Sequence, residues 1–191
     1  TYRVTRRYWD GGAPWTSLNP LRDISITDDG RYVVYISDAG NIIPNDYNGA
    51  ADVYIYDRLL DQTTSITELT GAGGGNLVNY ISSITSDGAY IIFTSTPTNI
   101  IPDDTNNVRD VVLYHVATGI TELLSITATG MQGNADSAVV VLSNDASTAA
   151  FITEADNFAP VTGQYNLFVK SVILPTTRPT APTLLTPITG T

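Results

Sequence analysis

Short apolar runs separated by polar turns recur along the chain, and they predict β-strands rather than helices. Arg22–Thr27 and Tyr32–Ser37 flank Asp28–Gly30, where the glycine accepts the positive φ of a hairpin turn. Tyr32–Ser37 is almost entirely apolar, which is typical of a central strand buried on both faces. With Val53–Asp57 and Ser65–Leu69, this stretch predicts four short antiparallel strands.

The same pattern returns at a constant interval of 58 residues. Gly30 recurs as Gly88, and Pro44 recurs as Pro102 and again as Pro160. The second copy predicts strands at Ser82–Thr85, Tyr90–Ser95, Val111–Tyr114 and Ile120–Leu124. A fixed period of this length predicts a repeat architecture, and four short antiparallel strands per unit are the pattern of a propeller blade.

The third copy is degenerate. Asp145-Ala146 stands where the other copies have Asp-Gly, and no clear fourth strand follows beyond Val172-Ile173. We therefore expect an all-β fold of three four-stranded antiparallel blades in an incomplete or open array, with the same strand order in each. The expected boundaries are 1–20 for an N-terminal arm and lead-in, 21–174 for the blades (21–69, 80–125 and 137–174), and 175–191 for an extended Pro/Thr-rich tail.

The arm alternates like a strand over Thr1–Trp9, and it is the basic part of an acidic chain. Residues 1–10 carry a net charge of +2, and the other 181 residues carry −12. Exposed large aromatic residues favour association, so we expect the arm to pack across its own blades or across a neighbouring copy. The residues expected to make this assembly contact are Tyr2, Arg3, Val4, Arg6, Arg7, Tyr8 and Trp9.

Composition narrows the classes of function. The net charge of −10 argues against nucleic acid as a partner, and no apolar run is long enough to cross a bilayer. Cysteine is absent, so there are no disulfides and no thiolate chemistry. The chain begins at Thr1 without a visible signal peptide, as a processed exported protein would. The Thr-rich tail could carry O-linked glycans.

The repeated motifs resemble a known family. Asp-Gly-(Arg/Ala)-Tyr, then Asn-Ile-Ile-Pro, then Asp-x-Asn-x-x-x-Asp-Val resemble the TolB-like (WD-like) β-propeller repeats of bacterial exported proteins, over about residues 21–125 and, more weakly, 137–173. The resemblance implies blades and an extracellular or cell-surface location, but no particular activity. Closed propellers typically have four to eight blades, and the three repeats of this chain are fewer than that. The tail resembles the start of an immunoglobulin-like domain, which implies a polypeptide that continues past Thr191.

Candidate chemistry is sparse. His115 is the only histidine, without the nucleophile or acid that a catalytic base needs, so we expect no catalytic residue and no enzyme. Acidic and amide side chains recur in the loops of the first two repeats: Asp46, Asn48 and Asp52, then Asp104, Asn106 and Asp110. Such oxygen ligands suit Ca²⁺, but the distant bidentate Glu of an EF-hand is missing. We expect these loops to work without a metal or cofactor, their carboxylates binding nearby backbone N–H groups.

Three functions are compatible with these features. The first, which we favour, is a structural subunit of an extracellular filament, assembled when the arm adds a strand to another copy of the chain. The second is a propeller binding module of a larger cell-surface or secreted protein. The third is the non-catalytic propeller of an exported hydrolase.

Overall fold

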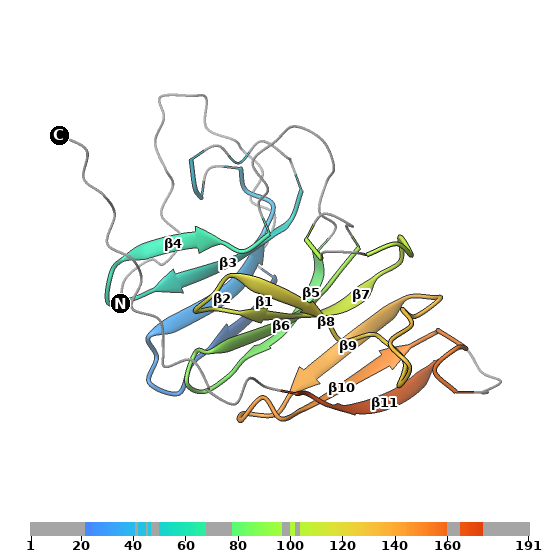
Figure 1. Cartoon of the computed structure of the whole chain (residues 1–191). Helices are drawn as coiled ribbons and strands as arrows, with labels where there is room; N and C mark the ends of the chain where they lie inside the picture. Colours follow the sequence, from blue (N-terminus) through green and yellow to red (C-terminus); the bar gives the residue numbers. More distant parts are fainter. Residues whose placement is uncertain are drawn as a thin grey trace.

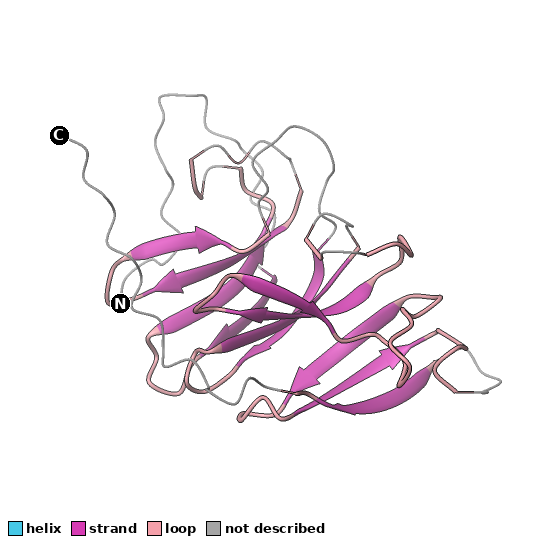
Figure 2. Ribbon diagram, viewed as in Figure 1, coloured by secondary structure: helices cyan, strands magenta, loops and turns pink. Residues whose placement is uncertain are grey.

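Every regular element in the described part of this computed structural model is a β-strand, as predicted (Figures 1 and 2). The structure describes residues 22–40, 42–44, 46, 50–67, 78–96, 100–101, 104–159 and 165–173. The arm and lead-in, the tail and Asn48, one of the loop residues considered as candidate ligands, lie outside these residues. Within these ranges no helix is long and apolar enough to cross a membrane.

The strands form three antiparallel sheets that follow one another along the chain and do not close into a ring (Figure 1). The first is β1 (Arg22–Ile26), β2 (Tyr32–Ser37), β3 (Asp52–Asp57) and β4 (Gln62–Ser65). The second is β5 (Val78–Ile84), β6 (Tyr90–Ser95), β7 (Asp110–His115) and β8 (Ile120–Leu123). The third has three strands in the described part of the chain, β9 (Ser137–Leu142), β10 (Thr148–Thr153) and β11 (Asn166–Ser171). Strand order follows the chain in each sheet, which confirms the predicted fold class of blades in an open array.

The first hairpin of each sheet is held by one recurring polar turn. Thr27 Oγ1 donates to Asp29 Oδ1 at 2.7 Å and accepts the N–H of Tyr32 at 3.0 Å. The other sheets repeat these contacts 58 and 116 residues later, at Thr85, Asp87 and Tyr90 and at Ser143, Asp145 and Thr148. The repeat in the sequence is therefore a repeat of local hydrogen bonding.

Two predicted strand positions are wrong. The fourth strand of the first sheet is Gln62–Ser65, not Ser65–Leu69, because a tight turn follows β3 at once. Asp61 closes that turn with a φ of 54°, and Gln62 then pairs with Asp57. The first strand of the second sheet, β5, starts earlier than the predicted Ser82–Thr85. Its pairing with β6 contains two register shifts, one between Val78 and Tyr80 and one between Ile81 and Ser83.

Two hydrophobic cores lie between the sheets. The first joins Val34 and Ile55 of the first sheet to Ile91 and Phe93 of the second. The second core joins the opposite face of the second sheet to the third, and it contains Ile92, Leu113, Val140, Ala149 and Phe151. The second sheet is therefore covered on both faces, whereas the third sheet is covered by the second on one face.

Candidate functional site

The first predicted acidic loop binds hydroxyl groups of its own sheet. Asp46 Oδ2 accepts the hydroxyl of Tyr54 at 2.7 Å, and burial raises the pKa of that tyrosine. Asp52 Oδ1 accepts the hydroxyl of Thr67 at 2.6 Å, while Thr67 Oγ1 accepts the N–H of Val53 at 2.9 Å. Both carboxylates thus bind side-chain hydroxyls.

The second acidic loop combines both kinds of contact. Asp104 Oδ1 accepts the N–H of Asn106 at 3.2 Å, and Asn106 Oδ1 accepts the N–H of Val108 at 3.0 Å, as in the predicted Asx turns. Asp110 Oδ1 instead accepts the hydroxyl of Ser125 at 2.5 Å. Among the described residues, no three His, Cys, Asp or Glu side chains gather closely enough to hold a metal ion.

The carboxyl of Asp110 has a raised pKa. Burial raises its pKa to about 6, and Asp104 and Asp136 add to the effect, although hydrogen bonds from Ser125 and Asn106 oppose it. The hydroxyls of Thr67 and Ser125 were not predicted as partners, yet they too stand 58 residues apart, and that spacing could have identified them.

His115 makes contacts typical of a structural histidine. Its ring packs edge-on against Tyr90, with 4.9 Å between the ring centroids. Its Nε2 lies 3.6 Å from Glu122 Oε2, a carboxylate on the neighbouring strand β8. These contacts fix the ring between β6 and β8.

The outer edge of the third sheet differs from those of the other two. In the first two sheets, the third strand pairs with a fourth, β4 or β8. The corresponding strand β11 pairs with β10 on one side and with no other strand of the described chain (Figure 1). An edge strand presents backbone N–H and C=O groups that an added strand can bind.

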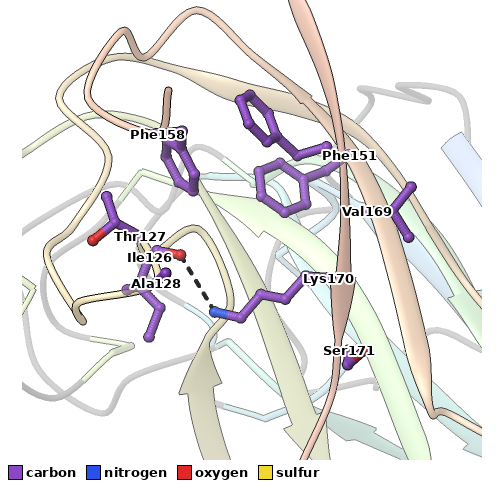
Figure 3. A pocket seen from close by; sticks show the side chains of 9 residues that line it. Ile126, Thr127, Ala128, Phe151, Phe158, Val169, Lys170 and Ser171 are labelled. Carbon is purple, nitrogen blue, oxygen red and sulfur yellow. Dashed lines mark hydrogen bonds between the residues drawn. The ribbon is translucent and has the colours of Figure 1, made fainter. Parts of the chain in front are cut away.

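A pocket of about 320 Å³ lies beside this edge (Figure 3), and no feature of the sequence predicted it. Three phenylalanine rings line it, with centroids 5.1–6.2 Å apart: Phe151, Phe158 and Phe168. The side chain of Lys170 also lines the pocket, and its Nζ donates to the carbonyl of Leu124 at 2.9 Å. Burial lowers the pKa of this lysine. The other lining residues are Ile126, Thr127, Ala128, Val169 and Ser171.

The pocket suits an apolar or aromatic side chain. Its walls are mainly rings and aliphatic groups, and the carbonyls of Leu124 and Ile126 already accept hydrogen bonds from Lys170. The predicted assembly residues of the arm lie outside the described residues, so the structure does not place them relative to this pocket.

Solved structures similar to this chain are β-propeller proteins. TolB from Acinetobacter baumannii matches 82% of this chain and 31% of its own length, with a TM-score of 0.50 and 20% identity. A putative TolB from Agrobacterium tumefaciens matches 82% of this chain and 47% of its own, with a TM-score of 0.49 and 16% identity. The tricorn protease matches 72% of this chain and 11% of its own length, with a TM-score of 0.47 and 10% identity.

The chain therefore spans less than half the length of either TolB protein. No protein-family model and no curated protein matches the sequence. At this level of identity the likeness to the Acinetobacter structure concerns the fold alone. Together with the sheets in chain order and their recurring hairpins, it shows that this chain is built from blades of a TolB-like β-propeller.

Proposed function

We propose that this chain is a structural subunit of an extracellular polymer, in which the arm of one copy pairs with the outer edge of β11 in the next. The observation that carries the proposal is that edge: β4 and β8 cover the equivalent strands, and β11 has no such partner in the described residues. An added strand would complete a four-stranded blade and bind the backbone groups of the edge.

The pocket supports an added strand at this place. In the second sheet, Leu123 of β8 pairs with Val112 and packs on the core shared with the first sheet. Phe168 occupies the position of Val112 in the third sheet, and it lines the pocket. A side chain placed opposite Phe168 would therefore enter the pocket, and the alternating Tyr2, Val4 and Tyr8 of the arm offer suitable groups.

Charge supports the choice of a second copy as the source of the strand. The basic arm and the acidic remainder of the chain, +2 and −12, attract one another between copies. Such attraction mainly speeds association and is screened by salt. Backbone pairing and aromatic burial would supply most of the affinity.

Deleting residues 1–10 tests the proposal. The shortened chain should be a folded monomer by circular dichroism and analytical ultracentrifugation, while the intact chain forms filaments visible by electron microscopy. Removing 175–191 is the matched control for truncation and should leave assembly intact. High salt should slow assembly more than it dissolves finished polymer. Loss of folding in the shortened chain, or undiminished assembly, would contradict the proposal.

The likeness to longer proteins favours a second function, a propeller binding module within a larger surface protein or an exported hydrolase. The chain spans 31% of the Acinetobacter TolB, so further blades of the same polypeptide could cover the third sheet. The native protein would then appear in electron micrographs as single closed rings and not as filaments.

A further inference from the structure

One set of positions in each repeat packs on the following sheet. In the first sheet these positions include Val34 and Val53, which are fully buried in the core shared with the second sheet. Fifty-eight residues later they are Ile92 and Val111, fully buried in the core shared with the third sheet. The same contact between sheets is thus made twice within the chain. We call the surface formed by these positions the forward face of a sheet.

The forward face of the third sheet is exposed. The positions of Val111 and Leu113 correspond there to Leu167 and Val169, allowing for a loop two residues shorter, and their side chains are 70% and 69% exposed. Cross-strand neighbours extend the patch, because Ala150 pairs with both Val141 and Val169. Val141 is also exposed, so the apolar surface spans all three strands.

The opposite, rear face of a sheet receives the preceding sheet. Ile84 of the second sheet is buried in this way, with 5% exposure. Its equivalent in the first sheet is Ile26, which is 57% exposed, and the neighbouring Ile24 is 64% exposed. Tyr35 on the same face is covered by Ile42 and Ile43, so the open rear surface centres on β1.

The hairpin at the start of each sheet repeats this difference. Gly88 receives the ring of Tyr32 from the preceding sheet, and a Cβ built at Gly88 would lie 2.7 Å from that ring. At the equivalent Gly30 the nearest atoms, from Arg58 and Ile26 of its own sheet, are 3.9 Å away. The rear face of the first sheet therefore has room at Gly30 for a side chain from a preceding sheet, placed as Tyr32 is placed against Gly88.

We infer that the forward face of the third sheet docks on the rear face of the first sheet of another copy, so that copies continue the stack of blades. The inference rests on the proposed function in taking a second copy as the partner, but it uses faces and not the β11 edge. The occupant is argued from the two internal contacts, which pair these same repeat positions. Since the two faces differ, the contact leads to an open filament or a closed ring.

Charged substitutions on either face provide the test. Leu167→Asp with Val141→Asp blocks the forward face at two exposed positions that do not line the pocket, and Ile24→Asp with Ile26→Asp blocks the rear face. Each variant alone should associate at least about tenfold more weakly than the wild type, since burying an unpaired carboxylate is costly. A mixture of the two should form heterodimers in sedimentation velocity, because the intact rear face of one variant still meets the intact forward face of the other.

Leu59→Asp with Leu60→Asp is the control, since both leucines are exposed on the turn after β3 and belong to neither face. Circular dichroism should show each variant folded. Variants that assemble like the wild type, or a mixture without heterodimers, would overturn the inference. A large loss of thermal stability in the forward-face monomer would do the same, because the chain itself would then cover that face. If deleting residues 1–10 leaves assembly unchanged, the proposed strand addition is wrong, but the contact between the two faces is not contradicted.

Discussion

Single hydroxyl groups tie the chain that follows one strand to the start of the neighbouring strand, through buried carboxylates. Ser125 Oγ donates to Asp110 and accepts the N–H of Val111 at 3.0 Å, so the chain after β8 is tied to the start of β7. Thr67 makes the same link to Asp52 in the first sheet. Hydrogen bonds to a charged group contribute about 1.5–3 kcal/mol each, which must offset the cost of burying the carboxylate.

Asp110→Asn should remove a pH-dependent part of the stability. The folded pKa of about 6 lies above the ordinary value of 3.8, so the folded state binds the proton more tightly than the unfolded state. Stability from this group is complete below about pH 4 and is lost as the pH rises through about 6. The asparagine variant should therefore gain stability on the order of 1 kcal/mol at pH 7.5.

Urea unfolding at pH 4.5 and pH 7.5 measures the effect. Asp28→Asn, at an exposed position, also removes one carboxylate and serves as the control. If the Asp110 variant keeps the wild-type difference between the two pH values, the assignment of this titration to Asp110 is wrong.

The sequence identified these carboxylates but not their partners. Asp52 and Asp110 were predicted from their spacing, and the Asx turns of the second loop follow from local residue chemistry. The hydroxyls lie 15 residues further along the chain. Only the register of β3 with β4, and of β7 with β8, brings them close, and an alternating pattern does not specify that register.

Strands were predictable where burial made them apolar. Tyr32–Ser37 and Tyr90–Ser95 were predicted with their observed bounds, since both faces of these central strands are buried. The strand β4 was misplaced because its residues, Gln-Thr-Thr-Ser, are polar and half-buried or exposed at the edge. There the tight turn at its start, and not hydrophobicity, sets its position.

Gly88→Ala should destabilise the contact between the first two sheets. Gly88 has a φ of 73°, and the added Cβ would meet the buried ring of Tyr32. Gly130, with a φ of 84° and no atom within 4 Å of the built Cβ, is a matched control. We expect a loss of about 1–2 kcal/mol for Gly130→Ala from the backbone conformation, and about 1–3 kcal/mol more for Gly88→Ala from overpacking.

Thermal or urea unfolding of both variants gives the two losses, and their difference isolates the contact with Tyr32. Equal losses would mean that the ring moves aside without cost, so the hairpin would not set the spacing between sheets.

The described sheets form a stack in which the second sheet has a neighbour on each face, whereas the first and the third have one neighbour each. Amide exchange should follow this order, slowest in β6 and β7 and faster in β9–β11, since local opening is easier where less surface is buried. Hydrogen-exchange mass spectrometry at low protein concentration measures it. Raising the concentration should slow exchange in β11 if copies associate there. Uniform exchange across the three sheets would contradict the prediction.

Repeat number was visible in the sequence, whereas the open face was not. Leu167 and Val169 alternate with Phe168 and Lys170, so the pattern contains two plausible inward faces for β11. Which of them is covered depends on the sheets present on either side, and no local signal specifies that. The fold was therefore predictable from single repeats, but the surface that we propose for assembly required the complete stack.

Sheets formed from consecutive strands can fold in the order in which they are synthesised. Each sheet can fold as it leaves the ribosome and cover the forward face of the sheet before it, as the two cores do. In the described residues, no later segment covers the forward face of the third sheet. A repeat added after the third would cover this forward face and leave both existing cores intact, so gene duplication could lengthen such a stack one repeat at a time.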